Sequence, residues 1–229
     1  MKSLTPVITI DGPCGVGKSV LSKQIAKKLH WFVLDSGIFY RTFALIALKY
    51  DIPMLEHELL KIFSLDLYYW CMEDQYNLIK LYKKNVPNII SEKTISYVSS
   101  KIAIFPKVRK ELLTTQRIFK KKPGLIANGR DMGTVVFPKA NLKLFLDGNL
   151  IVRAQRRFCE LRKKGIQVNF NSLKLEMYQR DIQDIKRSIS PLIPAKDAIM
   201  IDSTNMSFEE VFNISLKYIK INKILLSPI

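Results

Sequence analysis

The 229-residue sequence has few of the residues that most often hold structural metal ions. It contains only two histidines and three cysteines, Cys14, Cys71 and Cys159, which are far apart and form no CxxC pair. This composition argues against a structural zinc site, and we expect the thiols to be reduced.

Long apolar runs are absent as well. No stretch approaches the ~18 residues that a membrane-spanning helix needs, and Asp11 interrupts the first apolar segment before a signal-peptide core is complete. We therefore expect a soluble, cytoplasmic protein that has no membrane partner and is monomeric. The hydrophobic content of 48% is ample for a buried core, and the length fits one or two domains.

Acidic residues are scarce, because 20 Asp and Glu stand against 37 Lys and Arg, and the net charge is +17. Such a charge suggests a nucleic-acid partner. However, the lysines are spread along the whole chain, as on a solvated surface, and no RNA-binding motif is visible, so we expect no specific nucleic acid. Arginines are used selectively, since all but Arg41 lie between Arg109 and Arg187. Their planar fork suits phosphate and carboxylate groups.

The most informative stretch is Gly12–Ser19, GPCGVGKS, which fits the phosphate-binding pattern GxxxxGK[ST]. An apolar alternation at residues 7–10 precedes it and a helical pattern at 20–29 follows it, so the context is strand, loop and helix. The alternative is an ordinary glycine-rich turn. Cys14 inside this stretch is either a small residue that fits there or a thiol whose pKa is lowered by an electropositive loop.

The chemistry of a bound triphosphate explains the spacing of this motif. Gly12, Gly15 and Gly17 allow consecutive N–H groups to point at phosphate oxygens, and the start of the following helix adds partial positive charge. Lys18 supplies a full charge to the terminal phosphates, and the Ser19 hydroxyl is expected to bind Mg²⁺.

Short apolar segments alternate with helical patterns along most of the chain, which predicts an α/β fold with a five-stranded parallel sheet wrapped by helices. The expected strands are residues 7–10, 32–34, 125–127, 142–147 and 199–202. The expected helices are residues 20–29, 38–48, 92–103, 106–119, 150–164, 173–188 and 208–221. Between residues 53 and 87 the pattern changes, and strands at 65–70 and 78–82 predict a β-hairpin in an inserted subdomain.

A second ligand is suggested where the second strand ends. Ser36, Tyr40 and Arg41 follow that strand, and the ends of parallel strands line the ligand crevice of an open α/β sheet. A surface arginine is the alternative for Arg41.

Motifs along nearly the whole chain are similar to those of one family. They are Asp11-Gly12-Pro13; Leu34-Asp35-Ser36-Gly37 with Tyr40-Arg41; Phe105-Pro106 with Val108-Arg109; the run from Gly129 to Pro138; Phe145-Leu146-Asp147; Arg153-Ala154 with Arg156-Arg157; Lys164-Gly165; Arg180-Asp181 with Asp184 and Arg187; Pro191-Leu192; and Ile201-Asp202-Ser203-Thr204. Together they resemble the bacterial cytidylate kinases, which are nucleoside monophosphate kinases.

This resemblance implies transfer of the ATP γ-phosphate to CMP or dCMP with Mg²⁺, so the partners are small-molecule nucleotides. It assigns Arg41 and Arg130 to the acceptor phosphate with Arg187 nearby; Ser100, Arg109 and Asp131 to cytosine; Tyr40, Arg180 and Asp184 to the ribose; and Arg153 and Arg157 to a lid over the transferring group. It divides the chain into core segments 1–52, 106–152 and 173–229, a monophosphate-binding insert at 53–105 and a lid region at 153–172.

The sequence departs from the family pattern at three places. The loop reads Lys18-Ser19-Val20 where the family has Gly-Lys-Gly followed by Thr or Ser, so the hydroxyl stands in the common P-loop position. Asn128 stands where Asp is common, which weakens Mg²⁺ binding if that carboxylate holds the metal's water shell. An arginine of the insert is replaced near Ser91.

Two other readings remain open on the sequence alone. The chain is also compatible with a small kinase for AMP, dTMP or a non-nucleotide such as shikimate, because base choice depends on hydrogen bonds that spacing does not show. A basic, nucleic-acid-binding P-loop protein is the second alternative.

Overall fold

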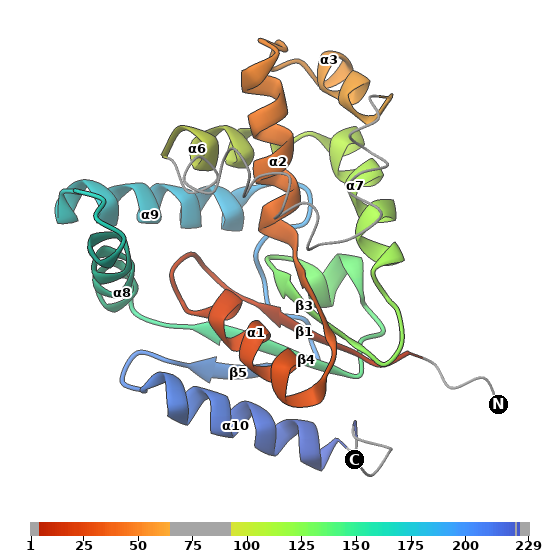
Figure 1. Ribbon diagram of the computed structural model, residues 1–229, viewed down its shortest axis with the longest axis vertical. Helices are drawn as coiled ribbons and strands as arrows, with labels where there is room; N and C mark the ends of the chain where they lie inside the picture. Colours follow the sequence, from red (N-terminus) through yellow and green to blue (C-terminus); the bar gives the residue numbers. More distant parts are fainter. Residues whose placement is uncertain (1–4, 65–92, 223, 225–229) are drawn as a thin grey trace. The chain divides into compact units, whose positions relative to one another are not determined.

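The computed structural model describes residues 5–64, 93–222 and 224 (Figure 1). The chain divides into two compact units, one formed by residues 1–33 and 120–229 and the other by residues 34–119. The predicted hairpin at 65–70 and 78–82, Cys71 and Ser91 lie outside the described residues. Among the helices that are described, none is both long and apolar enough to cross a membrane. The predicted domain boundaries stay a prediction.

The sheet has five strands in the order β2-β3-β1-β4-β5. The strands are β1 (Val7–Asp11), β2 (Phe32–Asp35), β3 (Leu125–Gly129), β4 (Leu142–Asp147) and β5 (Ile199–Asp202). The pairs β1–β3, β1–β4 and β4–β5 are parallel. All five strands that the apolar segments predicted are therefore confirmed, and the fold class is the α/β class expected.

The register of the central strands brings their carboxyl ends to one edge. Asp11, the last residue of β1, pairs with Gly129 of β3 and with Phe145 of β4. Every residue of β1 and β3 is buried, as expected of strands covered on both faces. The loop after β1 and Arg130 after β3 therefore leave the sheet side by side.

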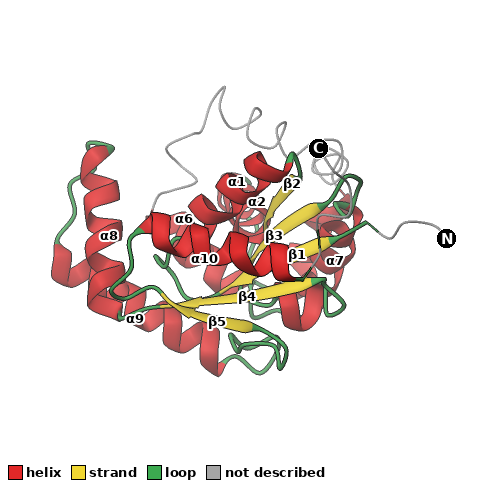
Figure 2. Ribbon diagram, turned by 90° about the horizontal axis from the view of Figure 1, so that it is seen from below, coloured by secondary structure: helices red, strands yellow, loops and turns green. Residues whose placement is uncertain are grey.

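Two helices of the first unit cover one face of this sheet (Figure 2). They are α1 (Lys18–Leu29) and α10 (Phe208–Ile221), whose buried Leu21, Ile25 and Val211 join strand residues in one core cluster. The start of α10 has a capping box, in which Ser207 and Glu210 bond each other's backbone N–H.

Two further helices of this unit, α8 (Leu150–Lys163) and α9 (Phe170–Lys186), pack against each other. One element of this first unit was not predicted, the single π-helical turn η3 (Met132–Val136) after β3. Its first two N–H groups, those of Met132 and Gly133, donate to the Asp11 carboxylate at 2.9 and 2.7 Å. This turn is therefore stabilised by a contact that is distant in sequence.

The described part of the second unit is mainly helical. It contains α2 (Ser36–Lys49), α3 (Glu56–Leu60), the 3₁₀ turn η1 (Lys61–Ser64), α6 (Lys93–Ile102) and α7 (Pro106–Ile118). Asp35 caps α2 by accepting a hydrogen bond from the Gly37 N–H at 3.0 Å, and Pro106 starts α7. The short helix α3 was not predicted, because five residues are too few to show a helical period.

Candidate active site

The loop after β1 has the backbone that its glycines predict. Gly12, Gly15 and Gly17 have φ angles of 147°, 75° and 99°. A Cβ on Gly12 would lie 2.0 Å from the Leu146 carbonyl oxygen, and one on Gly15 would lie 2.6 Å from Met177 Cε. A side chain at Gly12 is therefore excluded by the Leu146 backbone, and one at Gly15 is disfavoured mainly by its positive φ.

Lys18 is the first residue of α1, and its side chain turns back over the loop. Its Nζ donates to the Pro13 carbonyl oxygen at 2.6 Å, and the residue is only 7% exposed. Ser19 follows it and is exposed. The arrangement holds a buried cation and an accessible hydroxyl at the amino end of a helix, which are the groups that a phosphate chain and its metal ion require.

Ser19 is the residue best suited to Mg²⁺ in this loop. Among the described residues, no three His, Cys, Asp or Glu side chains gather where they would hold a metal ion. Mg²⁺ in kinases is bound by one or two protein oxygens together with substrate phosphates and water, so a single hydroxyl fits this mode of binding.

Asn128 on β3, which stands where the family commonly has Asp, is buried and is linked to the backbone of Ser19. Its Nδ2 donates to Ser22 Oγ at 2.8 Å, and Ser22 Oγ donates to the Ser19 carbonyl oxygen at 3.2 Å. The side chain therefore connects the sheet to the first turn of α1.

The backbone N–H and carbonyl groups of Cys14 are held from outside the loop by side chains of α9 and α8. Its N–H donates to Asp181 Oδ1 at 3.3 Å, and its carbonyl oxygen accepts from Arg153 Nη1 at 2.8 Å. Arg153 and Asp181 also form an ion pair of 2.7 Å, and Arg153 Nε donates to the Gly148 carbonyl oxygen. Arg153, predicted for the lid, is thus buried against the phosphate loop.

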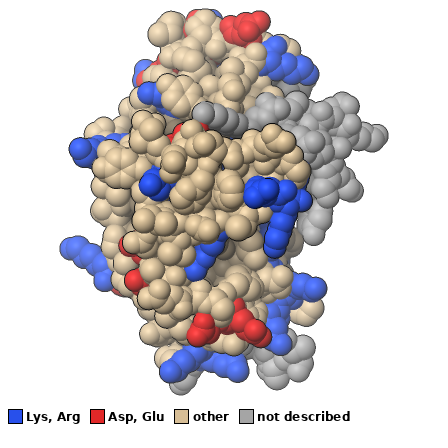
Figure 3. All heavy atoms as spheres, turned by 90° about the vertical axis from the view of Figure 1, so that its left-hand side faces the viewer, with Lys and Arg blue, Asp and Glu red and all other residues tan. Residues whose placement is uncertain are grey.

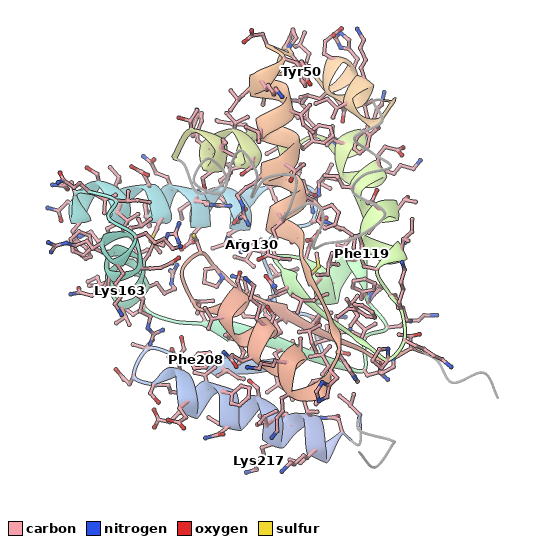
Figure 4. The ribbon with its side chains drawn as sticks, in the orientation of Figure 1. Tyr50, Phe119, Arg130, Lys163, Phe208 and Lys217 are labelled. Atoms are coloured by element: carbon pink, nitrogen blue, oxygen red, sulfur yellow. The ribbon has the colours of Figure 1, made fainter. Side chains whose placement is uncertain are left out.

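A second cluster of charge lies where β3 ends, at the labelled Arg130 (Figure 4). Arg130 Nε donates to Asp184 Oδ2 of α9 at 2.7 Å, and Arg187 Nη1 lies 3.6 Å from Asp184 Oδ1. Burial raises the pKa of Asp184, but the charges of Arg130, Arg180 and Arg187 lower it by more than burial raises it. The net shift is downward, and the carboxylate stays ionised.

Two of these cations, together with Lys18, also lower the pKa of the Cys14 thiol. Burial raises its pKa, but Arg180, Arg130 and Lys18 outweigh burial, and the pKa lies below its ordinary value. Lys18, Arg130 and Arg180, which are far apart in the sequence, thus lie near one loop.

Asp131, predicted to contact cytosine, is buried in the same unit.

Arg157 differs from these residues because it is accessible. Its Nη1 donates to Glu160 Oε2 of the same helix at 2.6 Å, and its side chain is 28% exposed. It can therefore change its partner more easily than Arg153 can.

The remaining predicted residues belong to the second unit. Arg109 is buried, donates from Nη1 to the Ala103 carbonyl oxygen at 3.0 Å, and places its guanidinium 5.6 Å from the centre of the Tyr40 ring. Arg41 Nη2 lies 4.0 Å from Asp35 Oδ1. Ser36 is buried in the first turn of α2, and Ser100 is half-buried on α6.

Two acidic residues of the site were missed as candidates. Asp181 stands three residues before Asp184, on the same side of α9, and this spacing was the available signal. Asp11 gave no local signal. Burial raises its pKa to about 6 even though it accepts hydrogen bonds from Gly133 and Met132.

A glycine-rich phosphate loop between the first strand and first helix of a parallel sheet defines the class of P-loop nucleotide-binding proteins. Comparison with known proteins narrows this class. The model of the cytidylate kinase family matches residues 8–221. The chain therefore belongs to the cytidylate kinase family, as the sequence motifs predicted.

Curated relatives agree with this assignment. Proteins named cytidylate kinase from Yersinia pestis (strain Pestoides F) and Yersinia pseudotuberculosis serotype O:1b (strain IP 31758) are each 44% identical over 220 residues, 95% of this chain and 95% of the relative. A solved gluconokinase from Sinorhizobium meliloti 1021 aligns with 98% of this chain and 99% of its own, at 12% identity and a TM-score of 0.46.

Proposed function

We propose that this protein transfers the γ-phosphoryl group of ATP to CMP and dCMP, giving ADP and CDP or dCDP. The observation that carries the proposal is the arrangement at the carboxyl edge of the sheet. A glycine loop with a buried lysine follows β1, and a partly buried, ion-paired arginine follows β3, the adjacent strand. Two anionic substrates are therefore served by neighbouring strand ends.

The donor triphosphate belongs in the loop from Gly12 to Ser19. Lys18 already lies across this loop, so ATP would exchange the Pro13 carbonyl for a phosphate oxygen as the partner of its ammonium group. Ser19 would hold Mg²⁺, which offsets charge on the transferring phosphates when bound.

The acceptor phosphate belongs to Arg130, with Arg187 beside it. Asp184 accepts from the Arg130 Nε at 2.7 Å and the Gly129 carbonyl oxygen accepts from its Nη1 at 3.4 Å, so both contacts hold the guanidinium that would bind the anion. In the second unit, Arg41 is assigned to the same phosphate, and Tyr40, Ser100 and Arg109 to the nucleoside.

Catalysis in this proposal is mainly positioning and charge stabilisation, because phosphoryl transfer requires little covalent participation by the protein. Lys18 and Arg130 bind the two anions, and the accessible Arg157 would approach the phosphoryl group between them. Exclusion of water by the lid region would favour transfer over hydrolysis.

The high net charge favours a second candidate, a nucleic-acid-binding protein. Lysine and arginine on the face in Figure 3 form separate groups among neutral and acidic residues, which does not support a continuous phosphate track. Steeply salt-dependent RNA binding without kinase turnover would favour this candidate instead.

A coupled assay of ADP release with ATP and a panel of CMP, dCMP, UMP, AMP and dTMP, with and without Mg²⁺, tests the proposal. We expect CMP or dCMP to be the fastest acceptor and turnover to require the metal. Lys18→Ala is the control, since it should reduce turnover by about a thousandfold without unfolding the protein. Much faster phosphorylation of UMP or AMP would overturn the substrate assignment.

A further inference from the structure

The backbone of Cys14 is held at both of its polar groups by side chains from outside the phosphate loop. Asp181 accepts its N–H at 3.3 Å, and Arg153 donates to its carbonyl oxygen at 2.8 Å. The ion pair between the two side chains, 2.7 Å long, completes a closed ring of contacts around the backbone of this one residue. The Cys14 N–H therefore points toward α9.

The two side chains of this ring are largely buried, so each depends on the other to neutralise its charge. The side chains of Arg153 and Asp181 are 7% and 10% exposed. Removing one member of a buried pair leaves the other as an uncompensated charge, whereas removing both is much less costly. The geometry of the Cys14 peptide is therefore tied to the presence of the Asp181 carboxylate.

The neighbouring glycine rests on the same two helices. A Cβ on Gly15 would lie 3.1 Å from the Arg153 carbonyl oxygen and 2.6 Å from Cε of Met177, which stands one helical turn before Asp181. The outer side of the loop is thus packed against α8 and α9 at two consecutive residues, Cys14 and Gly15.

The next turn of α9 contacts Arg130, the residue that we propose for the acceptor phosphate. Asp184, three residues after Asp181, orients Arg130 through a 2.7 Å hydrogen bond. One helix therefore fixes the donor loop with one carboxylate and the acceptor arginine with another.

We infer that Asp181 is a positioning residue for the ATP phosphates, acting through the Cys14 peptide and Arg153. This inference rests on the proposed function, because it assumes that the loop binds the donor. A loop held in its binding shape pays no ordering cost when the triphosphate enters, whereas a loop without the carboxylate samples other shapes and binds more weakly. The acceptor side, held by Asp184, should be largely unaffected.

Asp181→Asn is the test variant, since its amide oxygen can still accept the Cys14 N–H but no longer neutralises Arg153. Asp197→Asn is the matched control, because Asp197 forms a 2.8 Å ion pair with Lys143 at the opposite, amino end of β5. Calorimetric titration with ATP alone gives the donor affinity, and initial rates give the KM for CMP.

We expect Asp181→Asn to weaken ATP binding by about tenfold while the KM for CMP changes little. The control should keep the ATP affinity of the unmodified protein. Equal ATP affinity in Asp181→Asn and the unmodified protein, or an equal loss toward ATP and CMP, would overturn the inference. Failure of the unmodified protein to bind ATP would instead overturn the proposed function.

If Asp181→Asn does not fold, as judged by circular dichroism, the double variant Asp181→Asn with Arg153→Gln removes both buried charges and is expected to fold. It should also bind ATP about tenfold more weakly than the unmodified protein. Undiminished ATP binding by the double variant would contradict a positioning role for Asp181.

Discussion

Asn128 Nδ2 donates a 2.8 Å hydrogen bond to Ser22 Oγ, and this contact fixes the direction of a short chain of donors. Because the amide supplies the hydrogen, the Ser22 hydroxyl is able to give its own hydrogen to the Ser19 carbonyl oxygen at 3.2 Å. An ionised aspartate at position 128 has no hydrogen to donate and would compete for that of Ser22. The amide is thus connected, through Ser22, to the backbone of the residue that we propose for Mg²⁺ binding.

Asn128→Asp is expected to lower the Mg²⁺ concentration for half-maximal rate by about tenfold, because it adds a carboxylate to the hydrogen-bonded chain that leads to Ser19. Initial rates measured against free Mg²⁺ at saturating ATP and CMP check this. Ser22→Ala is the control, since it breaks the same chain without adding charge and should not lower the requirement. An Asn128→Asp variant with unchanged Mg²⁺ dependence would contradict the prediction.

Arg130→Ala should raise the KM for CMP by about a hundredfold, because it removes a partly buried cation and leaves Asp184 without its closest partner. The ATP affinity should change much less. Arg162→Ala is a matched control, since Arg162 of α8 stacks on Phe158 at 5.7 Å and has no place in the proposed site. An unchanged KM for CMP in a folded Arg130→Ala variant would remove Arg130 from the acceptor site.

The strands and the phosphate loop were predictable because their signals are local. β1 and β3 are fully buried apolar runs, and the loop needs glycine at fixed spacing for reasons of φ and close approach. The element after β3 was not predictable, because η3 depends on the Asp11 carboxylate, which is 121 residues from Met132 in the chain. Long-range partners of this kind have no periodicity to detect.

The arginines of α8 show the same limit more clearly. Their spacing of i, i+3 and i+4 puts Arg153, Arg156 and Arg157 on one face of the helix, but their partners differ. Arg153 bonds the phosphate loop, Arg156 donates to the Ser203 and Met206 carbonyl oxygens, and Arg157 pairs with Glu160. Spacing on a helix predicts which residues are neighbours, and it does not predict which of them is buried.

The Cys14 thiol should react with iodoacetamide faster than an ordinary thiol near neutral pH, because surrounding cations hold its pKa down despite burial. ATP bound in the loop should slow that reaction. The exposed Cys159 is an internal control whose alkylation ATP should not change. Peptide mapping by mass spectrometry at successive times measures both sites, and equal rates at Cys14 with and without ATP would show that the nucleotide does not cover this loop.

Asp11 makes the stability of the protein depend on pH in the opposite sense to an ion-paired carboxylate. Burial raises its pKa from 3.8 to about 6, so its contribution is fully present below pH 3.8 and is lost as the pH rises through 6. Asp11→Asn does not titrate. The free energy of unfolding of the unmodified protein minus that of Asp11→Asn should therefore fall by about 2.5 kcal/mol between pH 4 and pH 8. Urea unfolding at a series of pH values measures this difference, in which the titration of all other groups cancels, and a difference that rises with pH would mean that Asp11 is stabilised as the anion.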